Sequence, residues 1–316
     1  MDVLSDVITI MRTGRPRSAR VEWRAPWGQR FPSAPGSAGF QVVLQGSCWL
    51  LPSDESPGEP ALALSAGDVV FFPHGHGYTM ADHPSTPVTE PACDPAEESG
   101  LFASASVGGQ GASTVLLCGG YRHDPDRAHP LLRDLPELIH LPAGPGLNSE
   151  VRAAVHLLGA EIHQPKLGAD TVVSSLLDML LLYILRAYFS NGHGDCQVDG
   201  WAAALADPGV SAALDAIHRD PAHPWTVAEL GARAGLSRAA FARRFAALVG
   251  QPPLAYLTWW RLASAGRLLR ETDAPLSEIA GRVGYGSEFA FANAFKRDYG
   301  VAPGRYRRTV SECVRE

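Results

Sequence analysis

The chain reads VAELGARAGLSRAAFARRF at residues 227–245 and LSEIAGRVGYGSEFAFANAF at residues 276–295. The two stretches are copies of one unit. Matching residues are 49 positions apart before one inserted residue and 50 apart after it; the pairs include Glu229 with Glu278, Gly235 with Gly284, Ser237 with Ser287, Phe241 with Phe291 and Phe245 with Phe295. A repeat of this length indicates a supersecondary unit that occurs twice.

Each copy predicts a helix, a turn and a second helix. Apolar residues four apart mark the first helix, and Gly235 or Gly284 supplies a residue that turns at little steric cost. Ser237 and Ser287 are favourable N-caps for the second helix, whose phenylalanines face inward. A single copy would also fit an αα-hairpin packing unit. Two aligned copies favour paired helix-turn-helix motifs that insert their second helices into the major groove of DNA.

The outward face of each second helix carries the candidate DNA-binding residues. These side chains are small, polar or basic, apart from one phenylalanine. They are Ser237, Arg238, Ala239, Ala242, Arg243 and Arg244 in the first copy, and Ser287, Glu288, Phe289, Ala292, Asn293, Lys296 and Arg297 in the second. Residues 254–271 between the copies predict a helix of about 27 Å, which could hold the two reading helices a fixed distance apart.

The net charge of −6 divides unevenly along the chain. Residues 207–316 hold 15 Lys/Arg and 11 Asp/Glu, a balance of +4, and residues 1–206 hold 12 and 22, a balance of −10. Phosphate would repel the acidic part, so the distribution of charge favours nucleic-acid binding by the C-terminal part.

Length and composition place limits on the class of protein. The 316 residues suffice for two domains, and 46% hydrophobic with 19% charged residues is typical of a globular protein. The chain has no uninterrupted run of eighteen apolar residues and starts with acids rather than a secretory signal, so we expect no membrane segment and no export. Five scattered cysteines do not form a disulfide framework, which favours a reducing cytoplasm.

Residues 21–124 alternate between short apolar runs and Gly- or Pro-containing turns, which indicates a β-sandwich or barrel. The expected strands are 20–24, 40–44, 48–51, 61–64, 68–72 and 114–118. Residues 81–113 are rich in Pro, Ser, Glu and Gly and predict a long loop.

Helical patterns flank this β region. A short one begins at Val3, before a basic run at residues 12–20 that we interpret as a solvated face. Two more cover 149–163 and 168–190. The wide apolar face of 168–190 could form the core of its own domain or a dimer seam. Residues 191–195 break the pattern and predict an interdomain linker.

Residues 210–308 resemble the AraC/XylS DNA-binding domain. The second-copy positions carry the likeness, namely Ile279-Ala280, Val283-Gly284-Tyr285, Phe291, Ala294 through Arg297, Tyr299-Gly300, Pro303 and Tyr306-Arg307. The first 190 residues resemble the cupin-like ligand-binding domain of one branch of these regulators, through Ala25 to Gly28, Gly46 to Trp49, Gly67-Asp68, Phe72 to Gly75 and Leu117 to Gly119.

The resemblance implies an α+β protein in which a cupin-like β-barrel and helices precede an all-α domain with two helix-turn-helix motifs. It places a sensor and dimerisation domain at 1–190, a linker at 191–206 and the DNA-binding domain at 207–310. The implied function is sequence-specific transcription regulation in response to a sensed signal. The implied partners are double-stranded promoter DNA, RNA polymerase, an effector and a second copy of the chain, with no cofactor and no catalytic residues.

Two positions depart from the family patterns. Asn293 stands where these regulators commonly have arginine, although asparagine can still bond adenine in bidentate fashion. Tyr78 occupies the position at which metal-binding cupins carry a histidine ligand. A metal-dependent cupin enzyme with a DNA-binding appendage remains the contrasting hypothesis, with His74, His76 and His83 as candidate ligands. In a third hypothesis, the N-terminal domain serves only for dimerisation and senses no signal.

The nature of the effector stays open between a small apolar or aromatic ligand in the β fold and an oxidant. Some regulators that resemble this N-terminal domain respond to oxidants through cysteine, and Cys48 with Cys93 is the pair to consider. Acidic neighbours of Cys93 should slow its oxidation.

Overall fold

The computed structural model describes residues 2–11, 16–52, 60–88, 102–123, 129–144, 148–190 and 200–313. The chain forms two compact units. The β unit comprises Arg12–Ala128 and Leu135–Gly192, and the helical unit comprises Met1–Met11, His129–Asp134 and His193–Glu316. The helical unit therefore includes two short segments that the sequence analysis assigned to the N-terminal domain, and a helix, Gly200–Ala206, from the expected linker. Residues 191–199 lie outside the described residues.

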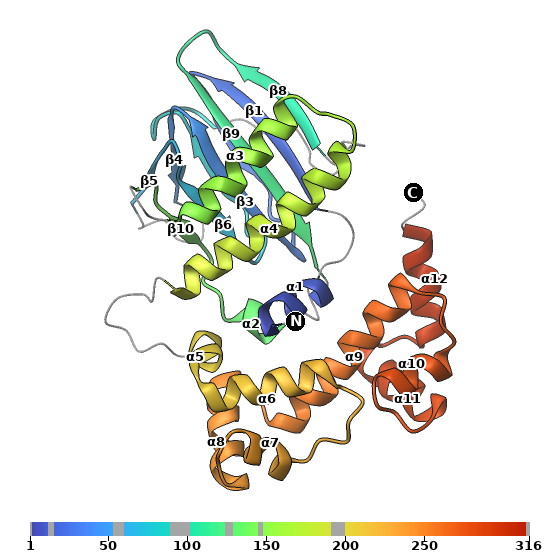
Figure 1. Ribbon diagram of the computed structural model, residues 1–316. Coiled ribbons are helices and arrows are strands. Elements are labelled where there is room, and N and C mark those ends of the chain that lie inside the picture. Colours follow the sequence, from blue (N-terminus) through green and yellow to red (C-terminus); the bar gives the residue numbers. More distant parts are fainter. Residues whose placement is uncertain are drawn as a thin grey trace. The chain divides into compact units, whose positions relative to one another are not determined.

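Ten described strands make two sheets in the β unit (Figure 1). The six-stranded sheet has the order β10-β6-β3-β9-β1-β8, with a parallel β1–β8 pair, and the four-stranded sheet has the order β2-β7-β4-β5. The strands are β1 (Arg17–Arg24), β2 (Gly28–Phe31), β3 (Ser37–Gln45), β4 (Ser47–Leu51), β5 (Leu62–Ser65), β6 (Val69–Phe72), β7 (Tyr78–Ala81), β8 (Phe102–Gly108), β9 (Ser113–Arg122) and β10 (Ile139–Leu141).

All six strands expected from the sequence are present, and the expected loop at 81–113 is wrong over β8. The β8 sequence alternates Ala and Ser rather than large apolar residues, and β8 is an edge strand with neither face fully buried. Local hydrophobicity therefore gave no strand signal. Its pairing with β1 supplies the backbone hydrogen bonds that hold it in the sheet.

The core of the β unit lies between the two sheets. Trp23 and Trp27 stack there at 5.0 Å, and Cys48, Phe72 and Met80 complete a buried apolar cluster drawn from both sheets. Helices α3 (Ser149–His163) and α4 (Ala169–Ser190) pack side by side across the six-stranded sheet (Figure 1). The Tyr121 hydroxyl donates to the Leu177 carbonyl at 2.6 Å and ties β9 to α4.

Helix α4 is long and apolar enough to cross a membrane by length and composition alone, with a mean hydropathy of 1.7 over its most apolar window. Core helices of globular domains pass the same test. Seven of its residues, among them Val173, Leu177 and Ile184, are buried within the protein. The packing of α4 on the sheet accounts for this apolar face.

The helical unit surrounds one long helix, α9 (Pro253–Glu271). Figure 1 shows α6, α7 and α8 around its first half and α10, α11 and α12 around its second half. The other helices of the unit are α1 (Val3–Met11), α2 (Pro130–Arg133), α5 (Gly200–Ala206), α6 (Pro208–Arg219), α7 (Val227–Arg233), α8 (Arg238–Val249), α10 (Leu276–Arg282), α11 (Glu288–Tyr299) and α12 (Pro303–Cys313).

The expected repeat is confirmed. Helices α7 and α10 start 49 residues apart and α8 and α11 start 50 apart, as the sequence pairs predict. The repeat continues into α9 and α12, which both begin at a proline. Gly235 and Gly284 have φ values of +67° and +82°, a left-handed conformation that glycine adopts without a Cβ penalty.

A chain of hydrogen bonds crosses the core of the helical unit at Tyr256, whose side chain is fully buried. His129 Nδ1 accepts from the Leu131 N–H at 2.9 Å, so its proton resides on Nε2, which donates to the Tyr256 hydroxyl at 3.0 Å. That hydroxyl donates to His218 Nε2 at 2.6 Å. The remaining His218 proton, on Nδ1, faces Asp6 at 3.4 Å. This pattern requires both histidines to be neutral.

Burial favours the same neutral state. It lowers the pKa of His129 well below its usual value, with smaller contributions from His218 and Arg133. Burial also lowers the pKa of His218, against the opposing effect of the Asp6 and Asp215 carboxylates. Protonation of His129 would direct a proton on Nδ1 at the Leu131 N–H. Protonation of His218 would direct a proton on Nε2 at the donating Tyr256 hydroxyl.

We therefore expect acid to destabilise the helical unit. An unfolded histidine binds a proton below about pH 6.5, whereas the pKa values of these two are lower in the fold, so the free energy of unfolding should fall as the pH drops below that value. Each histidine contributes up to about 1.4 kcal/mol per pH unit. Urea unfolding of the full chain between pH 7.5 and 5, followed by tryptophan fluorescence, measures this slope.

The matched variants are His129→Gln and His156→Gln. His129 is buried in the helical unit, whereas His156 is exposed on α3. His129→Gln should reduce the slope of unfolding free energy against pH by the equivalent of about one proton taken up on unfolding. His156→Gln should leave that slope unchanged. If His129→Gln prevents folding, His218→Gln gives the same comparison. An unaltered slope in the buried-site variant would contradict the assignment.

Candidate nucleic-acid interface

The first helix-turn-helix has well-defined helix starts. Thr226 and Glu229 form a reciprocal capping box at the start of α7, with the Thr226 N–H donating to Glu229 Oε2 at 2.8 Å. The turn through Gly235 leads to Ser237, whose hydroxyl accepts from the Ala240 N–H at the start of α8. Phe241, on the inner face of α8, is buried. These contacts fix the direction in which the outer face of α8 points.

That outer face is exposed as the sequence analysis expected. Ser237, Arg238, Ala239 and Arg243 are exposed, and Ala242 is partly buried. Arg238 and Arg243 lie five residues apart, so their guanidinium groups flank the small alanine side chains between them. A helix with small residues at its centre can approach base edges closely, and arginine is the side chain that most often bonds guanine there.

Arg244 has a structural contact that the sequence analysis did not anticipate. Its guanidinium pairs with the Asp207 carboxylate, which is only 7% exposed. Asp207 also caps α6 by accepting from the Val210 N–H at 2.8 Å. Burial acts to raise the pKa of Asp207, but the Val210 N–H and Arg244 outweigh it and lower that pKa. Arg244 therefore ties α8 to α6.

The second helix-turn-helix presents a different chemistry. Ser287 caps α11 by accepting from the Ala290 N–H at 3.2 Å. Phe289 is 77% exposed on the first turn of α11. The other candidate residues of this copy are also exposed, except the partly buried Ala292: they are Glu288, Asn293, Lys296 and Arg297. With Phe289 exposed on its first turn, α11 offers an apolar as well as a polar contact.

Arg261 links the two motifs, and sequence reasoning missed it. From α9 it donates to the Pro221 carbonyl at 2.6 Å and to the His223 carbonyl at 2.8 Å, both in the loop before α7. The turn of the second motif packs on the same loop, because a Cβ at Gly284 would lie 2.9 Å from Ala222 Cα and 2.8 Å from Arg261 Nη2. An arginine in an amphipathic helix gives no local signal of such a contact.

The candidate cysteines are in contrasting positions. Cys48 is 1% exposed in the core of the β unit. Burial, with a smaller effect of the Asp68 charge, raises the pKa of its thiol to about 12, which disfavours the reactive thiolate. Cys93 lies outside the described residues. Redox sensing through this pair stays a hypothesis.

The candidate metal ligands make other contacts. His74 Nε2 lies 2.8 Å from the Leu135 carbonyl, and His83 Nδ1 lies 2.8 Å from the Ser85 hydroxyl. Tyr78 stacks on Phe72 at 3.9 Å and accepts from the Gln41 amide. Among the described residues, no group of three or more His, Cys, Asp or Glu side chains is arranged to hold a metal ion.

Comparison with known proteins gives two family matches and several full-length relatives. Residues 2–190 match the model described as Cupin, and residues 230–309 match the model described as Helix-turn-helix domain. An AraC-like transcription regulator of Streptomyces antibioticus is 38% identical over 98% of this chain and 99% of the relative. The HTH-type transcriptional regulator MtrA of Neisseria gonorrhoeae is 29% identical over 98% of each chain. The crystal structure of the AdpA DNA-binding domain in complex with a target DNA shares 37% identity, covering 33% of this chain and 92% of that chain, with a TM-score of 0.31.

The two glycine turns generate a testable contrast. Gly235→Ala and Gly284→Ala both place a Cβ on a left-handed residue, which costs about 1 kcal/mol. Space is open around Gly235, whereas the new Cβ at Gly284 would overlap the backbone of Ala222. We expect unfolding free energies lower by about 1 kcal/mol for Gly235→Ala and by about 2–4 kcal/mol for Gly284→Ala. Urea unfolding of the two variants measures the difference, and equal losses would contradict the packing of the second turn on the first motif.

Proposed function

The chain belongs to the AraC-type transcription regulators with an N-terminal cupin domain, and on that basis we propose which residues read its DNA. The observation that carries the proposal is the exposure of two equivalent helix faces, on α8 and α11, that are held by the single helix α9. In this proposal α8 and α11 enter successive major grooves on one face of the duplex.

Different side chains take different roles in this proposal. Arg243 bonds a guanine edge, Asn293 bonds adenine, and Phe289 contacts a thymine methyl group. The remaining candidates near the helix starts and ends hold the phosphates: they are Ser237, Arg238, Ser287, Lys296 and Arg297. Ala239 and Ala242 let α8 approach the base edges. Glu288 repels phosphate and so restricts the register of α11.

The finer partners belong to the same proposal. We infer that the β unit senses a small apolar or aromatic effector, since the buried Cys48 thiol disfavours an oxidant response through that residue. Partly exposed apolar residues of α4, such as Leu181, Tyr183 and Phe189, support a homodimer. Promoter binding by such a regulator implies contact with RNA polymerase and action in the cytoplasm.

Adjacent arginines on α8 allow a matched test of base reading. Arg243→Ala should weaken binding by about 1–3 kcal/mol and relax the preference for one guanine, because a bidentate contact is lost. Arg244→Ala should instead lower the unfolding free energy by about 1–3 kcal/mol, because Asp207 loses its partner, and should keep the base preference. Selection of DNA from random duplexes by each full-length variant measures both preferences. Wild-type specificity in Arg243→Ala would contradict the assignment.

Phe289 can be tested on both sides of its contact. Phe289→Ala should weaken binding of a selected site by about 1 kcal/mol, because apolar area buried against a thymine methyl group is lost. Replacing each thymine in turn by uracil, which lacks the methyl group, should identify one position where the wild-type chain loses a similar amount. At that position the Phe289→Ala chain should bind the two duplexes equally. Additive losses at every thymine would argue against this contact.

A further inference from the structure

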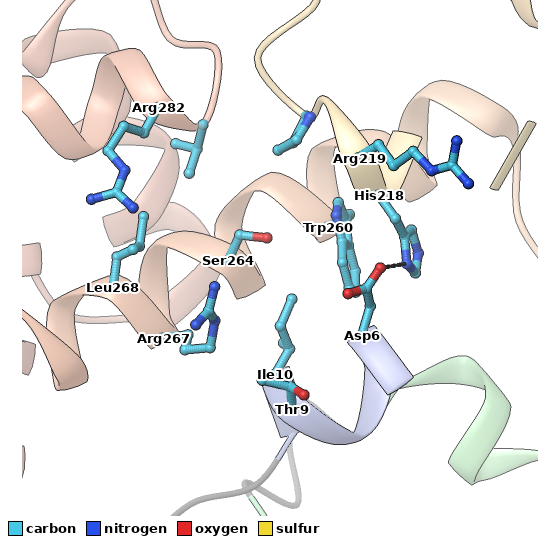
Figure 2. Close-up of a pocket in the computed structure, with 12 residues that line it drawn as sticks. Asp6, Thr9, Ile10, His218, Arg219, Trp260, Ser264, Arg267, Leu268 and Arg282 are labelled. Carbon is cyan, nitrogen blue, oxygen red and sulfur yellow. Dashed lines mark ion pairs between the residues drawn. The ribbon is translucent and has the colours of Figure 1, made fainter. Parts of the chain in front are cut away.

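A cavity of about 320 Å³ lies within the helical unit, beside α9. Figure 2 shows its lining from α1, the end of α6, α9 and the end of α10. It is separate from the outer faces of α8 and α11. Its volume is at the lower end of the range for small-molecule sites, about 300–1,000 Å³.

One wall of the cavity is apolar and includes the hydroxyl group of a serine. Trp260, Leu268 and Ile10 are among its apolar lining residues. Ser264 is only 9% exposed and lies on α9 beside Trp260. Figure 2 shows that hydroxyl directed into the cavity. A hydroxyl in this position can donate a hydrogen bond to a polar atom of a ligand.

Two guanidinium groups lie on the same side of the cavity, on either side of Leu268 (Figure 2). Arg267 uses Nη1 to bond Glu271 at 2.9 Å, and its Nε has no partner among the described residues. Arg282 lies 3.7 Å from Glu278, beyond hydrogen-bond distance. Exposed pairs of this kind contribute about 0–1 kcal/mol, so both arginines can share a second anion at little cost.

The one carboxylate in the lining is on the opposite side. Asp6 faces His218, as the dashed line in Figure 2 marks. The cavity therefore has a cationic side, an apolar wall and a buried hydroxyl. A carboxylate with a short hydrocarbon or ring matches these three features.

We propose that this cavity is a binding site for a small amphiphilic organic anion. Its carboxylate lies between Arg267 and Arg282, its apolar part lies along Trp260 and Leu268, and the Ser264 hydroxyl donates to a carboxylate oxygen. Such a ligand touches α6, α9 and α10, the helices that position both helix-turn-helix motifs. The site is independent of the residues assigned to DNA and of any effector in the β unit.

Calorimetric titration of the full chain without DNA tests the site. The probes are octanoate, octan-1-ol and octylammonium, which share a hydrocarbon tail and differ in charge. We expect one octanoate per chain with a dissociation constant below about 1 mM, and binding at least about tenfold weaker for the other two. Equal binding of octan-1-ol and octanoate, or no octanoate binding at that concentration, would overturn the proposal.

Variants locate the bound anion. Arg267→Gln should weaken octanoate binding about tenfold, because a charge-assisted hydrogen bond is lost. Ser264→Leu should abolish it by filling the cavity. Arg305→Gln, an exposed charge-matched control on α12, should leave it unchanged. If Ser264→Leu fails to fold, Arg282→Gln takes its place with an expected loss of the same order as Arg267→Gln. Full affinity in Arg267→Gln would refute the assignment of this cavity.

Discussion

One hydroxyl group, that of Tyr256, joins three distant parts of the chain. It accepts from His129 and donates to His218, and His218 in turn faces Asp6. Because the Tyr256 side chain is fully buried, solvent water cannot replace either of its two hydrogen-bond partners. Helix α9, which connects the two helix-turn-helix motifs, therefore packs against residues near Asp6 and His129. Part of the core around α9 thus comes from outside the C-terminal hundred residues.

The parts of the fold that could be predicted are those with local signals. Glycine turns, serine caps and inward phenylalanines recur at a constant offset, so α7, α8, α10 and α11 could be predicted almost to their ends. Short runs of Val, Leu and aromatic residues likewise predicted β1, β3, β4, β5, β6 and β9. Exposure of the candidate reading residues followed from the same pattern, since the face opposite a buried Phe241 or Phe291 must meet solvent.

The parts that could not be predicted depend on contacts between distant residues. Nothing near Arg244 in the sequence shows that its guanidinium pairs with the Asp207 carboxylate at the start of α6. His129 follows a stretch of polar residues and could be taken for a surface histidine, yet it is fully buried. Helix α1 has an apolar face that would suit either unit. In each case the position of the residue depends on a contact with a residue more than thirty positions away in the sequence. The local sequence pattern gives no indication of that contact.

The position of α1 has a consequence for the order of events during synthesis. Val3, Val7 and Ile10 are almost completely buried, and α1 packs on α6 and α9. Arg270 donates to the Ile10 carbonyl at the end of α1 and to the Tyr306 hydroxyl on α12. Helix α1 can therefore complete its contacts only after α6, α9 and α12 have been synthesised. Until then its apolar face stays available to chaperones and to other nascent chains, and closure of such a long loop is intrinsically slow.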